Sequence, residues 1–528
     1  MRRFHSYGPV NARSHFSVPR TVLVEDCLNS LIGNDIEGGH YFTLWAPRQT
    51  GKTWLMQEVR RQIQLMYPEQ FIVGMMSMQG LSFITDKPVI EFLKKIPKLF
   101  LDTFSMDIKP PETYEEWTYL FHRTKGVFQK PVILFIDEFD SLPAAVIDQL
   151  VSLFRDIYLN RSQYCIHSLA LIGVRAVLGV DSERGSPFNI QRSLHVPNFT
   201  LDEVTDLLDQ YQLESGQIVE TEVVGSVYES TNGQPGLVGW FGELLTEKYN
   251  PGIAAAIDLK TWETVYRKAL YVEWNNTILN LIKKAMGEYQ PYVLNLFSRS
   301  DIPFNLRANW CSYLYLNGII SYTTQQKTNE EMVEICRFAA PFIQSCLFDS
   351  LTLDLIGDRM TGMAVDPLDD LADVFGGETL NLPSLLDRYK AYLIRMKAKG
   401  LNPFKDQPRR TDLHYTEAVG HFHLYAWMKQ AVEDVCVISP EFPTGNGKVD
   451  LHLKCRDNLG ITEIKSFRSH ARTQSGILQA ASYARSLNLT SVTIALFVPL
   501  DDVSVLASLS KEIQCDGVVV TVVAIGWT

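Results

Sequence analysis

A short glycine-containing loop near the start of the chain has the residues that bind a nucleoside triphosphate. Residues 46–53 are A-P-R-Q-T-G-K-T and lie between a predicted strand and a predicted helix, which is the context that a phosphate-binding loop needs. The backbone N–H groups of such a loop hold phosphate, while its lysine reaches the β- and γ-phosphate oxygens. Its threonine hydroxyl faces Mg²⁺. The predicted nucleotide-binding residues are Ala46, Pro47, Arg48, Gln49, Thr50, Gly51, Lys52 and Thr53, with alanine at the first position, where glycine is usual.

A second motif supplies the carboxylates that ATP hydrolysis requires. Residues 132–138 are V-I-L-F-I-D-E, a buried strand that ends in two acids. We predict that Asp137 holds Mg²⁺ and that Glu138 polarises the attacking water. The two motifs together predict binding of ATP with Mg²⁺. Hydrolysis follows less directly, because some proteins with such loops bind nucleotide only as switches.

A third group of chemically capable residues lies near the C-terminus. Asp450, Glu463 and Lys465 have the spacing D-x₁₂-E-x-K on two predicted strands. Two carboxylates can hold hard divalent cations through oxygen, and a neighbouring lysine can offset charge that develops on a phosphate. A hairpin turn at 457–458 would place Asp450 opposite Lys465 and Glu463 opposite His452, with the three side chains on one face. The alternative is an ordinary solvated Glu-Lys pair on a strand.

The elements around these motifs predict a multidomain α/β protein. Apolar strands at 41–46, 71–78, 131–137, 168–174 and 193–196 alternate with helices, a pattern typical of a parallel sheet covered on both faces. We divide the chain into a core at 1–200, a helical lid at 201–259, a middle region at 260–350, a linker at 351–410 and an α/β domain at 411–528. Helices followed by a hairpin make the middle region either a winged helix or a further helical lid. The linker is acidic at first, and the basic residues 388–410 then either contact nucleic acid or balance that acidic segment.

The N-terminal motifs resemble a known family. The loop 46–53, FIDEFDSL at 135–142, PNFTLDEV at 197–204 and TNGQPGLV at 231–238 look like the AAA-like ATPases of bacteria and archaea, which are related to the STAND signalling proteins. This resemblance implies that Arg175 senses the γ-phosphate and that Pro235 packs near the base. It also implies that Arg192 can act on a neighbouring subunit of a homo-oligomer that forms on nucleotide binding.

The C-terminal segment 411–500 resembles the PD-(D/E)xK nuclease superfamily, whose order is a helix, a hairpin, a Q-x-x-x-Y helix and a strand. The resemblance implies that Glu417, on a helix with His421, is a further metal ligand beside Asp450 and Glu463. It also implies that Gln479 and Tyr483 lie beside Lys465 and the scissile phosphate. Cleavage with Mg²⁺ or Mn²⁺ would leave a 5′-phosphate.

Composition limits the remaining functional classes. The 528 residues carry a net charge of −11, which excludes a globally basic nucleic-acid binder but not a local basic site. There is no apolar stretch of about 18 residues that would span a membrane, and the first residues do not resemble a secretory signal. The eight cysteines are scattered without a C-x-x-C pair, which argues against a zinc ribbon or a disulfide framework. We therefore expect a cytoplasmic protein.

Together these features favour an ATP-regulated, metal-dependent nuclease that cleaves nucleic acid, with DNA favoured over RNA. Family analogy suggests defence against phage or mobile elements, with a trigger or partner protein that the sequence does not identify. The alternative is a STAND-like switch whose nuclease-fold domain only binds nucleic acid. A helicase-type motor is disfavoured because no helicase-specific motif is present.

Overall fold

The computed structural model divides into two compact units, which we describe separately. The first unit comprises Met1–Glu273 with Asn305–Ile319, and the second comprises Trp274–Phe304 with Ile320–Thr528. The structure describes the chain except for residues 9, 34–37, 85, 174–191, 299–301, 327–331, 357–363, 367–368, 377–379, 403, 405–412, 433, 445–446, 456–457, 468 and 528, and the side chains of 192, 298, 355–356, 413–418, 441–444, 447–449 and 471–472. Among the described residues, no helix is long and apolar enough to cross a membrane.

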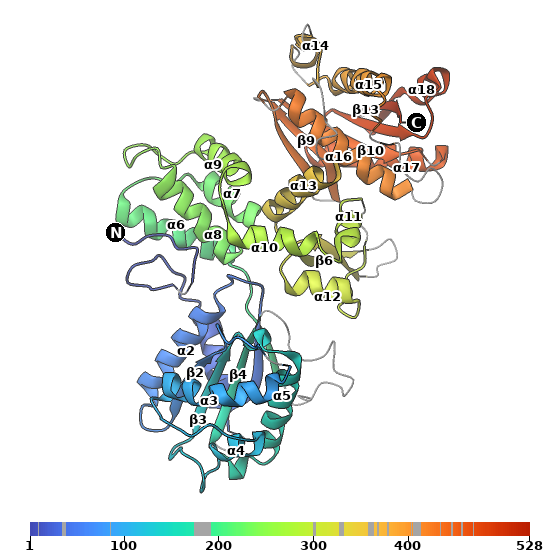
Figure 1. Cartoon of the computed structure of the whole chain (residues 1–528). Coiled ribbons are helices and arrows are strands. Elements are labelled where there is room, and N and C mark those ends of the chain that lie inside the picture. Colours follow the sequence, from blue (N-terminus) through green and yellow to red (C-terminus); the bar gives the residue numbers. More distant parts are fainter. Residues whose placement is uncertain are drawn as a thin grey trace. The chain divides into compact units, whose positions relative to one another are not determined.

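The first unit contains a parallel sheet and a group of helices that follows it in the chain (Figure 1). Its elements are α1 (Thr21–Ile32), β1 (Tyr41–Trp45), α2 (Lys52–Met66), β2 (Ile72–Ser77), α3 (Pro88–Phe104), α4 (Tyr114–Tyr119), β3 (Val132–Asp137), η1 (Phe139–Ser141), α5 (Ala144–Leu159), η2 (Arg161–Gln163), β4 (Ile166–Gly173), β5 (Arg192–His195), α6 (Leu201–Ser215), α7 (Thr221–Thr231), α8 (Pro235–Glu243), η3 (Leu244–Lys248), α9 (Leu259–Tyr271) and α12 (Asn309–Leu316).

The sheet has the strand order β2-β3-β4-β1-β5, and every neighbouring pair is parallel. The predicted parallel sheet is therefore confirmed. All six residues of β3 are buried, and alternate ones face opposite sides. Leu134 packs with α3, α4 and α5, whereas Phe135 packs with α1 and α2. Because both faces are covered, the polar ends of the strands are the part of the sheet left to form a site.

The second unit contains a small hairpin and a larger mixed sheet (Figure 1). Its elements are α10 (Asn276–Ala285), α11 (Gln290–Ser298), β6 (Ile320–Gln326), β7 (Met332–Phe338), α13 (Pro341–Ile356), α14 (Ala372–Phe375), α15 (Leu382–Ala398), α16 (Leu413–Val432), β8 (Val437–Thr444), β9 (Gly447–Cys455), β10 (Asn458–Ser466), α17 (His470–Ser486), β11 (Ser491–Val498), α18 (Val503–Leu509), β12 (Lys511–Cys515) and β13 (Val518–Gly526). The hairpin β6–β7 is antiparallel and matches the hairpin predicted for the middle region.

The mixed sheet has the order β12-β13-β11-β10-β9-β8. The strands β10, β11 and β13 run parallel, while β8, β9 and β12 pair in antiparallel fashion. Residues of α17 pack on one face against Ile461, Ile494 and Val520. On the other face Phe497 contacts Tyr389 of α15. Glu463 pairs with Ile494 and Lys465 with Leu496 across the parallel strands, so both polar residues lie on the face that α17 covers.

The hairpin β9–β10 corrects the predicted register. Cys455 pairs with Asn458 and Leu451 with Thr462, so the pairing is shifted by two residues from the prediction. His452 therefore lies opposite Ile461 rather than Glu463, and continuing the register places Asp450 across from Glu463 rather than Lys465. A shift of two residues preserves the face of every side chain. The three predicted residues consequently still share one face.

The cysteines also differ from the prediction, because Cys436 and Cys455 form a disulfide. Val437 pairs with Lys454, and this register brings the two cysteines together across β8 and β9, with Cα atoms 4.2 Å apart. The pairing depends on strand register over 19 residues of sequence separation. The spacing of the cysteines alone therefore did not reveal it.

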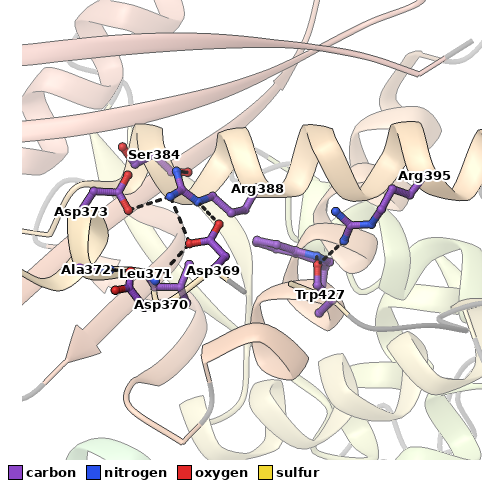
Figure 2. Close-up of polar contacts among 10 residues, drawn as sticks. Asp369, Asp370, Leu371, Ala372, Asp373, Ser384, Arg388, Arg395 and Trp427 are labelled. Carbon is purple, nitrogen blue, oxygen red and sulfur yellow. Dashed lines mark hydrogen bonds and ion pairs between the residues drawn. The ribbon is translucent and has the colours of Figure 1, made fainter. Parts of the chain in front are cut away.

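The predicted linker contains a docked helix. Residues of α15 that include Leu386 and Tyr389 are fully buried, so this helix belongs to the second unit. Arg388 of α15 bonds Asp369 at 2.7 Å and Asp373 at 2.8 Å, and Figure 2 shows the guanidinium between both carboxylates. The basic helix thus balances the acidic segment before it. This pairing disfavours the alternative in which Arg388 contacts nucleic acid.

A second contact fastens the same segment. Arg395 and the indole N–H of Trp427 both donate to the carbonyl of Ala364, at 3.1 and 3.0 Å, and Figure 2 shows these side chains converging. Lys397 of α15 bonds Asp501 at 2.7 Å. The cations of α15 named here therefore serve the packing of this unit.

Replacing Arg388 by methionine should loosen the acidic segment without unfolding the unit. The side chain is 26% exposed, so we expect the loss of its ion pairs to cost about 1 kcal/mol locally. Hydrogen exchange should accelerate in peptides that cover 369–376. Lys390→Met removes an exposed pair with Asp387 on the same helix and serves as the control. Equal exchange in the two variants would contradict this role of Arg388.

Candidate functional site

The phosphate-binding loop of the first unit has the backbone that its role requires. Gln49 and Gly51 have φ values of 58° and 89°, in the left-handed region that glycine adopts most readily. Immediately after Gly51, α2 begins at Lys52, so the free N–H groups of its first turn point toward the loop. Within this loop Thr50 is buried and its hydroxyl donates to the carbonyl of Pro47 at 2.9 Å. The loop is therefore shaped before any phosphate binds.

Lys52 folds back over this loop. Its ammonium donates to the carbonyl oxygens of Ala46 and Pro47 at 2.8 and 2.6 Å. Burial lowers the pKa of Lys52 to about 8, while the charges of Asp140 and Asp137 act in the opposite direction. A buried ammonium held only by neutral carbonyls and nearby acids is well placed to exchange these partners for phosphate oxygens.

The predicted Mg²⁺ ligands and the predicted base lie together at the end of β3. The hydroxyl of Thr53 donates to Asp137 at 3.0 Å, and the other oxygen of Asp137 accepts the backbone N–H of Glu138 at 2.9 Å. Burial, and next the charge of Asp137, raise the pKa of Glu138. Two adjacent oxygens from Thr53 and Asp137 fit a hard cation. Glu138 follows the strand in a left-handed conformation, with φ of 54°.

A cavity of about 550 Å³ extends from these residues into an apolar region. Besides the loop and the carboxylates, it is lined by two of the motifs that carry the resemblance, at Phe199 and Pro235, and by the first residues of the chain. These lining residues are Phe4, His5, Phe16, Arg20, Phe199 and Pro235. The guanidinium of Arg20 donates to the carbonyl of Pro197 at 2.8 Å and lies over the ring of Phe199. The N-terminal segment is thereby joined to the start of the helical region.

The segment before α8 contacts the loop directly. The amide of Gln234 donates to the carbonyl of Arg48 at 3.1 Å, and the backbone N–H of Gly236 donates to the carbonyl of Gln49 at 2.9 Å. A Cβ atom at Gly236 would lie 2.6 Å from that of Gln49, so only glycine permits this approach. Pro235 lines the cavity, and its packing near the base stays a prediction, whereas Arg48 is exposed. Arg175 and the side chain of Arg192 lie outside the described residues.

In the second unit the side chains of Asp450, Glu463 and Lys465 lie close together. Lys465 lies 3.1 Å from an oxygen of Glu463 and 3.6 Å from an oxygen of Asp450. That oxygen of Asp450 also accepts the backbone N–H of Ile464 at 2.6 Å. The last residue pair of β9–β10 is Leu451 with Thr462. The side chain of Asp450 thus binds the N–H of Ile464 just beyond the end of this pairing. The three predicted residues form one cluster.

Glu463 is buried in this cluster, with 1% of its surface exposed. Burial, and next the charge of Asp450, raise its pKa, and Lys465 only partly opposes them. One of its carboxylate oxygens is buried without a hydrogen-bond partner among the described residues. An orphaned carboxylate oxygen is costly, and a divalent cation would satisfy it. Asp450 and Glu463 therefore fit a cation by donor type, whereas no group of three candidate ligand side chains occurs among the described residues.

The Q-x-x-x-Y helix lies over the cluster. A Cβ atom at Gly476 of α17 would contact the side chain of Lys465 at 3.8 Å. Gln479 donates to the hydroxyl of Tyr483 at 2.5 Å, and the charge of Glu463 contributes, after burial, to a raised pKa of Tyr483. The structure therefore brings this pair near the cluster. The side chain of Glu417 lies outside the described residues, so its role as a ligand stays a prediction.

Lys52→Ala should remove ATP binding while leaving the fold intact. The ammonium makes charge-assisted bonds with phosphate, so we expect ATP affinity to fall by at least about 10- to 100-fold. Isothermal titration calorimetry measures this change, with Lys130→Ala as the control because Lys130 pairs with Glu69 at the surface. An unchanged affinity in Lys52→Ala would reject the assignment of this loop.

Glu463→Gln should stabilise the metal-free protein as pH rises. An acid with a raised pKa keeps its proton in the folded state, so wild-type stability falls as pH rises above the usual glutamate pKa of about 4.3. The amide avoids this loss, and its advantage should grow to about 1–3 kcal/mol by neutral pH. Urea unfolding in EDTA at several pH values tests this, with exposed Glu512→Gln on β12 as the control. A variant that is less stable than wild type at pH 8 would contradict the assignment.

Solved structures and a family model are similar to parts of this chain. Similar solved structures include the Walker-type ATPase PABY2304 of Pyrococcus abyssi, with 16% identity over 65% of this chain and 99% of that chain and a TM-score of 0.43. Another is the Aeropyrum pernix ORC1 protein in complex with DNA, with 13% identity over 63% of this chain and 93% of that chain and a TM-score of 0.34. A third is the Thermotoga maritima RuvB Holliday junction branch migration motor, with 14% identity over 57% of this chain and 89% of that chain and a TM-score of 0.33. No curated protein matches the chain. A family model described as an AAA-like domain matches residues 5–277, more than half of the chain, and the chain belongs to this family of P-loop ATPase domains.

Proposed function

We propose that this AAA-like protein is an ATP-controlled, metal-dependent nuclease. The observation that carries the proposal is the cluster of Asp450, Glu463 and Lys465 on one face of β9–β10, with a buried and unpartnered oxygen on Glu463. Burial of Glu463 beside the charge of Asp450 lowers stability. Sites that hold charged groups at such a cost are commonly functional.

In the first unit, Thr53 and Asp137 would hold Mg²⁺, which neutralises phosphate charge when it is bound. Lys52 would leave the carbonyls of Ala46 and Pro47 and bind the β- and γ-phosphate oxygens. Glu138 would orient the attacking water and accept its proton, and burial, which raises its pKa, makes it a stronger base than an ordinary glutamate.

In the second unit, Asp450 and Glu463 would hold Mg²⁺ or Mn²⁺, which polarises the scissile phosphate and water when it is bound. Lys465 would turn from these carboxylates toward the phosphate and offset the charge that develops on it. Gln479 would orient water or phosphate beside Lys465. Glu417 would complete the ligand set from α16.

The substrate that we propose is nucleic acid, with DNA favoured. Assembly into a homo-oligomer when nucleotide binds would bring copies of the nuclease cluster together. The biological setting that we propose, defence against phage or mobile elements, rests on the family resemblance alone.

One observation favours the alternative in which the second unit only binds nucleic acid. Lys465 lies 3.1 Å from Glu463 and 3.6 Å from Asp450, so its ammonium already offsets part of the negative charge of the pair without any metal. A binding-only module would keep this arrangement at all metal concentrations. A nuclease would exchange Lys465 for a divalent cation.

The proposed function predicts DNA cleavage that depends on both sites. Purified protein should cleave linear or circular DNA with Mg²⁺ or Mn²⁺. Lys465→Ala should reduce the rate by about 100-fold or more, whereas Lys511→Ala on the edge strand β12 should not.

The coupling between the two units is tested in the same assay. ATP should change the wild-type rate, and Lys52→Ala should abolish this response. The expected coupling is about 1–3 kcal/mol. Cleavage that ignores ATP and Lys52→Ala would reject the control by ATP, and the absence of cleavage with either metal would reject the nuclease.

A further inference from the structure

A buried histidine fixes the backbone of the proposed metal ligand Asp450. The Nε2 atom of His421 lies 2.9 Å from the carbonyl oxygen of Asp450. A carbonyl can only accept a hydrogen bond, so Nε2 carries the proton and donates it. His421 is 3% exposed, which shields this bond from competing water. The bond joins helix α16 to strand β9 at the residue whose carboxylate faces Lys465.

This contact lies where the β9–β10 ladder stops. The last pair is Leu451 with Thr462, and the next backbone donor, Ile464, bonds the carboxylate of Asp450. The side chain of Asp450 is thereby held from β10, while its main chain is held from α16 by His421. A ligand whose backbone and side chain are both fixed presents its oxygens to a cation without a further ordering cost.

The imidazole ring of His421 is itself packed against a third element. The ring centroid of Phe348 of α13 lies 4.8 Å from the ring centroid of His421 and 4.4 Å from that of Phe422. An ion pair of 2.7 Å between Lys429 and Asp349 joins the same two helices. In the chain, α13 directly follows the hairpin β6–β7. Two side chains, Phe348 and His421, therefore connect α13 to Asp450.

We propose that His421 is a positioning residue for the cation site of Asp450 and Glu463, and that Phe348 sets the orientation of its ring. The inference rests on the proposed function and adds its regulation. A displacement of α13 would turn the imidazole, free the carbonyl of Asp450 and weaken cation binding. The hairpin and α13 would thus control the nuclease cluster through the loading of its metal.

The test measures Mn²⁺ binding directly, by electron paramagnetic resonance of free Mn²⁺ with the full chain and without nucleotide. The Mn²⁺ binding that is lost in Glu463→Gln is assigned to the cluster of Asp450, Glu463 and Lys465. His421→Met fills the space without a donor, whereas His421→Gln keeps an N–H near the position of Nε2. We expect His421→Met to weaken Mn²⁺ binding about tenfold or more, and His421→Gln to stay within about threefold of wild type.

A second pair of variants tests the role of α13 and does not depend on the folding of His421→Met. Phe348→Leu should weaken Mn²⁺ binding several-fold. Phe297→Leu is the matched control, because the ring of Phe297 packs on Phe348 and Phe422 in the same cluster, and it should bind as wild type does. Thermal unfolding of each variant shows whether the fold is kept.

Several outcomes would overturn the inference. Wild-type affinity in His421→Met, or equal weakening in His421→Met and His421→Gln, would show that the donated hydrogen bond does not position Asp450. Equal effects of Phe348→Leu and Phe297→Leu would show that α13 does not orient the ring of His421. If Glu463→Gln leaves Mn²⁺ binding unchanged, the cation site itself is absent and the inference falls with it. Mn²⁺ binding without DNA cleavage would reject the proposed nuclease, while the His421 comparison still decides the inference.

Discussion

A lysine ammonium beside partly or fully buried carboxylates is the interaction on which both proposed sites depend. In the first unit Lys52 lies near Asp137 and Asp140, and in the second Lys465 lies between Asp450 and Glu463. Charges taken out of water need a partner of opposite sign. Each proposed site therefore holds a lysine beside its acids. Phosphate oxygens can replace the carbonyls that Lys52 contacts, and a divalent cation can replace Lys465 beside Asp450 and Glu463.

The surrounding folds explain why these charges are buried at all. In both units the acids lie on or at the ends of strands whose neighbours are apolar, and helices cover the sheet. Residues 132–136 of β3 are entirely apolar before Asp137. Glu463 lies beneath α17 among residues such as Ile461 and Ile494. The apolar packing holds the carboxylates in place and makes their unpaired states costly, which favours ligand binding.

Much of this arrangement follows from local sequence signals. Strands β1 to β4 of the first sheet are visible as largely apolar runs, because parallel strands covered on both faces are continuously apolar. The loop before α2 is visible as a glycine-lysine motif. The shared face of Asp450, Glu463 and Lys465 also follows from the two-residue period of strands. These features depend on neighbours in the sequence.

The remaining features depend on tertiary contacts. The register of β9–β10 was wrong by two residues, and the Cys436–Cys455 disulfide was missed, because strand pairing decides both. The docking of α15 through Arg388 and the bond from His421 to Asp450 join residues 19 and 29 apart in the chain. In the first unit, the close approach of Gly236 to Gln49 has no signal in spacing. Such contacts appear only when the elements are packed.

The most direct test of the proposed cation site is to locate Mn²⁺ in crystals of the full chain by anomalous scattering. We predict a Mn²⁺ peak bonded to Asp450 and Glu463, with Lys465 displaced from both carboxylates. Crystals that take up Mn²⁺ elsewhere, or not at all, while Lys465 still bridges Asp450 and Glu463 would contradict it.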